Sequence, residues 1–246
     1  MNEIRTSENY FPLFLSIKGK KCLVVGGGDV AYRKVQSLLP TGARIIVVSP
    51  RVVQGLTFLE AKERIRIRKR SFHVNDMRGT ILVIGATDSV DVNRKVWSQA
   101  TKKGILCNVV DRPALCNVIF PSVVRRGRLQ IAISTGGASP AMASFIRRNM
   151  EADYGDEYAL ALEILWSLRR RVLRQKGDPE KNRELFHRVT SQQFIDLCRD
   201  RDERKLDLFI REATHQRISL AALGIRLSQR DVAAAESHVP RGENPT

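Results

Sequence analysis

A short apolar run followed by three glycines is the first stretch whose residue types suggest chemistry. Residues 21–33 read KCLVVGGGDVAYR, in which Gly26, Gly28 and Ala31 fit the spacing G-x-G-x-x-[GA]. The first glycine permits a tight turn, the second lets a pyrophosphate approach the backbone, and the alanine lets a helix pack closely on a sheet. The N-terminus of that helix adds unpaired N–H groups and a partial positive charge. The pattern favours dinucleotide binding over a purely structural turn.

The end of the second predicted strand departs from the usual form of this motif. The stretch Ser49-Pro50-Arg51 stands where an aspartate or glutamate normally holds the adenine ribose. Arg51 could instead accept the extra phosphate of NADP. This position by itself therefore leaves NAD and NADP both open.

The elements that must position this turn are strands alternating with helices. Buried or half-buried apolar runs predict five strands: Lys21–Val25, Arg44–Ser49, Ile65–Lys69, Thr80–Ala86 and Leu106–Val110. Helical spacing of apolar residues predicts a helix from Ala31 to Leu39, ended by Pro40, and a second from Val90 to Lys103. This alternation predicts an α/β fold with a Rossmann-like, doubly wound parallel sheet, which we assign to residues 1–117.

The rest of the chain has a different character. Residues 118–152 contain two extended pieces around Arg126-Gly127, then a glycine turn and a helix opening at Ser139-Pro140. Such a strand pair has an exposed edge, and pairing with a second subunit is one way to cover it. We therefore predict that residues 118–152 form a dimerisation segment and that the protein is a homodimer.

Residues 153–225 predict a small helical domain. Its first helix carries an apolar stripe, which we assign to Leu162, Leu165, Trp166, Val172 and Leu173. Residues 226–246 lack apolar periodicity, and we therefore predict that they form a disordered tail.

The composition restricts the classes of partner and the compartment. A formal net charge of +16 suggests an anionic partner, but no helix-turn-helix, aromatic RNP strand or zinc pattern indicates nucleic acid. No apolar stretch approaches the roughly 18 residues that span a bilayer, and Glu3 and Glu8 argue against a signal peptide. We expect a cytoplasmic protein that binds neither nucleic acid nor membrane. Four cysteines fit neither a zinc site nor a disulfide framework: Cys22, Cys107, Cys116 and Cys198.

Four ordered motifs carry a more specific likeness. The stretches YFPLFLSIKGKKCLVVGGGDVAYRK, GATDSVDVN, CNVVDRPALCNVIFPSVV and ISTGGASPAMA lie between about Tyr10 and Glu151. In order and spacing they resemble the precorrin-2 dehydrogenase/sirohydrochlorin ferrochelatase family, which also forms the N-terminal module of sirohaem synthase. The resemblance implies NAD-dependent oxidation of precorrin-2 to sirohydrochlorin, in many members followed by insertion of ferrous iron to give sirohaem. It also implies a homodimer.

The resemblance extends to individual site residues. The family's dinucleotide contacts map onto Asp29 and Val30 in the glycine turn, beside Gly26, Gly27 and Gly28, and onto Pro50 and Arg51. Because those positions accompany NAD in the family, NAD becomes the favoured cofactor.

The family's essential aspartate corresponds to Asp111 in NVVDRP. It follows a predicted strand, where doubly wound sheets place their ligand crevice, and a carboxylate there could take a proton from the macrocycle or transiently escort a metal ion. The alternative is an aspartate that caps the turn before Pro113. Asn108 could orient substrate or serve as a turn-forming amide.

A second group of substrate-binding candidates follows the strand pair. Gly136 and Gly137 could hold a tetrapyrrole carboxylate on their N–H groups, or form a plain turn. Thr135 stands where some family members carry a serine described as a phosphorylation site, and the sequence leaves its modification open. Arginines could pair with the acetate and propionate groups of precorrin-2, or cover a solvated face. The candidates are Arg125, Arg126, Arg128 and the run Arg169–Arg171.

The main alternative is a Rossmann-type nucleotide-sensing regulatory domain without catalysis. It would not need NVVDRP followed by the FPS and STGGASP stretches. A glutamyl-tRNA-reductase-like enzyme would need a catalytic cysteine domain ahead of Lys21, where only about twenty residues stand. The sequence leaves open whether iron insertion is retained, which metal is used, and whether the product goes to sirohaem, haem or a cobalamin precursor.

Overall fold

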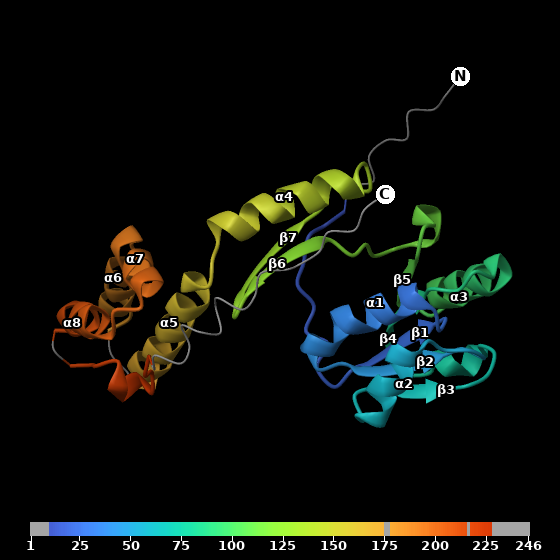
Figure 1. The fold of residues 1–246 in the computed structure, drawn as a ribbon, viewed down its shortest axis with the longest axis horizontal. Helices are drawn as coiled ribbons and strands as arrows, with labels where there is room; N and C mark the ends of the chain where they lie inside the picture. The colour runs from blue at the N-terminus through green and yellow to red at the C-terminus, as the bar shows by residue number, and fades with distance from the viewer. Residues whose placement is uncertain (1–9, 175–177, 216, 228–246) are drawn as a thin grey trace, which may run out of the picture. The chain divides into compact units, whose positions relative to one another are not determined.

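A computed structural model describes residues 10–174, 178–215 and 217–227 of the chain. The chain divides into two compact units, Met1–Phe120 and Pro121–Thr246, which we describe separately (Figure 1). Most of the predicted tail, residues 228–246, lies outside the described residues, as do Glu3 and Glu8. The finer division into dimerisation and helical segments stays a prediction.

The first unit is built on one parallel sheet, as the sequence predicted. Its five strands have the order β3-β2-β1-β4-β5, in which the chain reverses its direction of winding between β1 and β4. The strands are β1 Lys21–Val25, β2 Arg44–Val48, β3 Arg66–Arg68, β4 Thr80–Gly85 and β5 Leu106–Val109. A crevice at the carboxyl ends of β1 and β4 is therefore the expected ligand position.

Helices cover both faces of this sheet (Figure 1). The helices α1 (Asp29–Leu38) and α2 (Gln54–Ala61) pack on one face, where Val24, Val47 and Ile84 point. Helix α3 (Val90–Lys102) packs on the other face, against Leu23 and Val83. Alternate residues of the central strands thus enter two different cores, which explains their continuous apolar runs and confirms the doubly wound arrangement.

The second unit begins with the predicted strand pair. Strands β6 (Ser122–Arg126) and β7 (Leu129–Ile133) form a two-stranded antiparallel sheet. Helix α4 (Pro140–Asp153) follows, and the hydroxyl of its N-cap Ser139 accepts a hydrogen bond from the Met142 N–H at 3.1 Å. The remaining helices are α5 Glu157–Arg174, α6 Pro179–Val189, α7 Gln192–Asp200 and α8 Glu203–Ala213.

The apolar stripe predicted on α5 is partly wrong. The fully buried residues of α5 are Ala161, Ile164, Leu168 and Val172, with spacings of three and four residues. Trp166 and Leu173, assigned to the stripe from their hydrophobicity, are 42% and 56% exposed. The buried face is set by where α7 and the η4 turn (Ala221–Leu223) pack on α5, and hydrophobicity alone does not reveal that choice.

Within the described residues, no helix has both the length and the apolar character needed to cross a membrane.

Candidate functional site

The three glycines after β1 have different surroundings. A Cβ atom on Gly26, whose φ is +128°, would lie 1.9 Å from the Ala86 carbonyl oxygen, and one on Gly27 would lie 2.0 Å from the Arg51 carbonyl oxygen. No side chain can be accommodated at such distances. A Cβ on Gly28 would meet nothing within 4 Å. The first two glycines are therefore required by packing, whereas Gly28 faces open space.

Gly28 is also the N-cap of α1, and no side chain caps this helix. The first intrahelical bond is donated by the Tyr32 N–H to the Gly28 carbonyl at 3.0 Å, so the N–H groups ahead of it lack intrahelical partners. Asp29 and Val30 occupy this first turn. An open approach to uncapped N–H groups at a helix N-terminus fits a dinucleotide pyrophosphate.

The loop after β2 is held directly against the glycine turn. The Val53 N–H donates to the Gly27 carbonyl at 2.8 Å, and the Ser49 hydroxyl donates to the Arg51 carbonyl at 2.6 Å. Pro50 and Arg51 are exposed beside the turn, and the Arg51 guanidinium makes no hydrogen bond or ion pair with any described residue. The structure thus brings the predicted dinucleotide residues of the first and second strands together.

Asp111 follows β5, at the carboxyl edge of the same sheet. Its φ of +57° lies in the left-handed region, which aspartate adopts more readily than most residues. The turn around it is closed by backbone bonds, from the Arg112 N–H to the Val109 carbonyl and from the Leu115 N–H to the Arg112 carbonyl. Within the described part of the chain the Asp111 carboxylate is exposed and accepts no hydrogen bond. It does not cap the turn, and it is available to a ligand.

Asn108 lies on β5 and is 8% exposed. Its amide nitrogen donates to the Val118 carbonyl at 3.0 Å and therefore ties β5 to the segment that follows. This contact is a structural use of the amide; a role in orienting substrate stays a prediction.

Sequence reasoning missed one charged residue beside Asp111. Lys34 of α1 is half-buried, and its ammonium nitrogen lies 4.6 Å from the centroid of the Phe120 ring. Burial and the neighbouring Arg33 lower the pKa of Lys34, while the charges of Asp111 and Cys116 oppose this shift. Lys34 directly precedes buried Val35 on α1. Its position at the border of the buried face of this helix could therefore have been inferred from the sequence.

The predicted turn in the second unit is held mainly by its own groups. The Thr135 hydroxyl accepts from the Ser139 N–H and donates to the Ser139 carbonyl, both at 3.1 Å. Gly136 and Gly137 have φ of +60° and +85°, and a Cβ on either would meet nothing within 4 Å. Their positive φ values explain why glycine stands here. Carboxylate binding at this turn stays a prediction.

Two of the candidate arginines are engaged inside the second unit. Arg126 donates to the Glu151 carbonyl at 3.1 Å, and its Nε lies 3.6 Å from Asp156, within ion-pair but beyond hydrogen-bond distance. Arg128 pairs with Glu163 at 3.4 Å and lies over the ring of Trp166. Neither guanidinium is wholly free for a substrate carboxylate.

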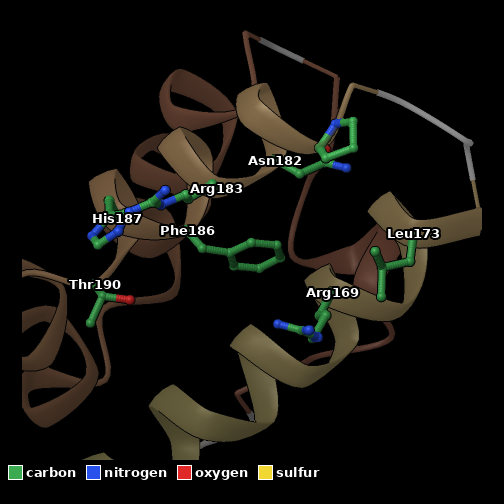
Figure 2. Close-up of a pocket in the computed structure, with 8 residues that line it drawn as sticks. Arg169, Leu173, Asn182, Arg183, Phe186, His187 and Thr190 are labelled. Atoms are coloured by element: carbon green, nitrogen blue, oxygen red, sulfur yellow. The ribbon is translucent and has the colours of Figure 1, made fainter.

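A cavity of about 550 Å³ lies among the helices of the second unit (Figure 2). The side chains of Arg169 and Phe186 extend into it, with the guanidinium carbon 5.8 Å from the ring centroid. Arg183 and His187 lie together on one side of it. Of the residues predicted for the site, only Arg169, from the arginine run, lines this cavity.

The described residues include no group of three or more His, Cys, Asp or Glu side chains placed to hold a metal ion. The four cysteines, all within the described ranges, form no disulfide with one another. Burial raises the pKa of Cys22 to about 11 and those of Cys107 and Cys198 to about 12. These three thiols are therefore protonated and poorly nucleophilic at neutral pH.

Comparison with known proteins agrees with this geometry. A family model described as NAD(P)-binding matches residues 13–122, and one described as sirohaem biosynthesis protein central matches residues 126–152. The sirohaem synthase of Thioalkalivibrio sulfidiphilus is 39% identical over 181 residues, 74% of this chain and 37% of that protein. The sirohaem synthase of Nitrosomonas europaea is 40% identical over 179 residues, 72% of this chain and 38% of that protein. The chain is therefore related to the sirohaem synthases.

A solved structure extends this relationship. The structure of SirC, a precorrin-2 dehydrogenase, superimposes with a TM-score of 0.71 and 27% identity, covering 84% of this chain and 100% of that one. The chain spans less than two-fifths of the length of the two sirohaem synthases. The family resemblance predicted from the sequence motifs is confirmed.

Proposed function

We propose that the chain is an NAD-dependent precorrin-2 dehydrogenase that produces sirohydrochlorin. The observation that carries this proposal is the exposed, unpaired Asp111 carboxylate at the edge of a sheet whose first strand ends in an open glycine turn. The structural similarity to SirC, a precorrin-2 dehydrogenase, supports the choice of reaction.

Each part of the first unit has a distinct task in this reaction. The uncapped N–H groups of α1 bind the pyrophosphate, Gly28 leaves room for it, and Pro50 and Arg51 flank the adenosine. NAD held by these residues would supply the hydride acceptor for the oxidation. The oxidation removes a hydride and a proton from the substrate. The Asp111 carboxylate accepts the proton.

NAD is the proposed cofactor although Arg51 lies beside the turn. Ser49, which directly follows β2, donates its hydroxyl hydrogen bond to the Arg51 carbonyl and so fixes the Arg51 backbone rather than its guanidinium. We expect NAD to support turnover at least as well as NADP in initial-rate measurements. A strong preference for NADP would show that Arg51 binds the extra phosphate and would reverse this assignment.

Insertion of ferrous iron into sirohydrochlorin is proposed as a second activity of the same site. Iron would enter as a substrate, and the unpaired Asp111 carboxylate is a suitable oxygen ligand for its delivery. The homodimer and the cytoplasmic location belong to this proposal as predictions from the sequence. The remaining alternative is a nucleotide-sensing domain without catalysis, which would bind NAD and convert nothing.

The decisive experiment supplies anaerobically prepared precorrin-2 and NAD to the purified chain. NADH formation and the absorbance change to sirohydrochlorin are expected together, in equal amounts. Ferrous iron is added afterwards, with a reaction lacking protein as the control for spontaneous insertion. Binding of NAD without any oxidation would refute the dehydrogenase and favour the sensing domain.

A further inference from the structure

The ammonium group of Lys34 lies close enough to Asp111 for the charge of that carboxylate to raise its pKa. Lys34 lies on α1, the helix whose N-terminus carries the glycine turn, and its nitrogen lies 4.6 Å from the Phe120 ring centroid. Phe120 ends the segment that follows β5 and Asp111. The side chain therefore reaches from the cofactor-binding helix to the segment that carries the carboxylate.

The Lys34 ammonium contacts an aromatic ring but has no hydrogen-bond acceptor or anion bound to it among the described residues. The face of the Phe120 ring attracts a cation, but it accepts none of the three directed hydrogen bonds that an ammonium can donate. Across the described residues, the Lys34 ammonium donates no hydrogen bond and forms no ion pair. Its neighbour Arg33 on the helix is exposed to solvent, whereas Lys34 is half-buried. A half-buried cation without an anion loses hydration that a bound carboxylate would replace.

The charges around Lys34 show what kind of ligand the position favours. Burial and Arg33 both act against the charged form of Lys34 and lower its pKa, and only Asp111 and Cys116 act in its favour. An additional anion at this position would therefore be stabilised. Asp111 does not fill the role, because no ion pair joins it to Lys34 and its carboxylate is exposed.

We propose that Lys34 binds a carboxylate of the tetrapyrrole substrate and thereby sets which edge of the macrocycle faces Asp111. The proposal rests on the proposed function and adds a specificity-determining residue to it. Precorrin-2 carries acetate and propionate groups around its rim, so a cation beside the proton acceptor can fix one of them while the reacting carbon lies at Asp111. Arg126 and Arg128 are less suited to this task, since Asp156 and Glu163 already engage them.

The test compares Lys34→Met with Arg33→Met. Methionine keeps the apolar stem against Phe120 and removes the charge, and Arg33→Met makes the same change in net charge one residue away on the exposed side of α1. The measurements are the Kd of sirohydrochlorin from fluorescence quenching, the KM of precorrin-2, the Kd of NAD and the melting temperature. Lys34→Arg and Lys34→Gln are made alongside.

For Lys34→Met we expect the Kd of sirohydrochlorin and the KM of precorrin-2 to rise about tenfold or more, as for loss of a charged hydrogen bond. The Kd of NAD should stay unchanged, Arg33→Met should bind like the wild type, and Lys34→Arg should recover most of the affinity. If Lys34→Met does not fold, Lys34→Gln gives the same measurement.

Two results would overturn the role of Lys34. One is wild-type affinity in the folded Lys34 variants, and the other is an equal loss in Arg33→Met, which would reveal only a general attraction of charges. Failure of the proposed function is distinguishable from both, because the wild-type chain itself would then neither oxidise precorrin-2 nor bind sirohydrochlorin.

Discussion

At the scale of single residues, neighbouring glycines of the turn serve different purposes: one is required by packing and the other leaves space for a ligand. Gly27 and Gly28 are adjacent, yet a Cβ on Gly27 would lie 2.0 Å from a backbone oxygen and one on Gly28 would meet nothing within 4 Å. Gly28 also has an extended backbone with φ of −82°, which any residue can adopt. The two positions therefore form a matched pair for mutation.

Gly28→Val is expected to keep the melting temperature within a few degrees and to weaken NAD binding at least about tenfold, because its side chain fills the phosphate approach. Gly27→Val is expected to destabilise the fold, by about 1–3 kcal/mol or more, since its neighbours cannot yield without backbone movement. Calorimetric titration with NAD and thermal unfolding measure both effects. An unchanged Kd in Gly28→Val would move the cofactor away from this turn.

Asp111 offers the sharpest chemical prediction. Asp111→Asn preserves shape but removes the charge and the capacity to accept a proton, and no hydrogen bond within the described structure depends on this side chain. We expect normal folding and NAD affinity with a dehydrogenase rate at least about a hundredfold lower, the lower end for loss of a positioned base. Iron insertion should fall as well if the same site serves it. Near-normal rates in both assays would contradict the catalytic role.

The local sequence pattern was enough to predict where some of the candidate site residues lie. Gly28 and Arg51 each lie in the loop after a predicted strand, and the carboxyl ends of neighbouring parallel strands meet at one edge of the sheet, so the pattern alone places them together. Lys34 was missed because its significance depends on Phe120, which lies 86 positions further along the chain. The structural contact of Asn108 with Val118 is likewise tertiary, and the sequence left its role open.

At the scale of elements, a buried carboxylate in the connection between β3 and β4 binds the end of β3 and the loop that follows it. Asp76 lies in the η2 turn (Val74–Met77), is 1% exposed, and accepts from Arg68 at 2.5 Å, Arg70 at 2.6 Å and the His73 N–H at 2.9 Å. Burial acts to raise the pKa of Asp76, but these hydrogen bonds outweigh it and hold the pKa well below its usual range. The network therefore stabilises the fold only while Asp76 is ionised.

The sign of the resulting pH dependence follows from this lowered pKa. The contribution of ionised Asp76 to the free energy of unfolding is complete above the pKa of about 4 that the carboxyl has in the unfolded chain. This contribution is lost as the pH falls toward the lower pKa of the folded state. Asp76→Asn should lower the free energy of unfolding at pH 7 by about 2 kcal/mol. The difference in the free energy of unfolding between wild type and variant, measured by urea unfolding, should then become smaller below about pH 4. A gap independent of pH between 7 and 3 would show that the charge of Asp76 is not what stabilises this region.

Elements were predictable where the apolar pattern was strong. The five strands and the start of the helix after Ser139 were predicted to within a residue or two, because continuous apolar runs and an N-cap followed by proline are local signals. Helix α2 was not predicted, since among its eight residues only Leu56 is buried and no periodicity can be read from one position. The stripe of α5 was misassigned because Trp166 is more hydrophobic than Ala161, yet packing buries the alanine.

At the scale of the whole molecule, the second unit presents surfaces that a single chain leaves open. Strands β6 and β7 pair only with each other among the described residues, so each has a second edge with unpaired backbone groups. On α4, Met142 and Phe145 are three residues apart on one face and are 51% and 50% exposed. The combination of an open sheet edge and exposed apolar side chains in residues 118–152 is consistent with the predicted homodimer.

We therefore expect light scattering at micromolar concentration to give about twice the chain mass of 27.8 kDa. A double variant with Met142→Asp and Phe145→Asp should shift the protein toward the monomer, because two charges would have to be buried at the interface without partners. Leu208→Asp is the control, since Leu208 on α8 is 54% exposed but lies outside the predicted dimerisation segment. A wild-type monomer would refute the homodimer, whereas a dimer equally sensitive to Leu208→Asp would place its interface beyond residues 118–152.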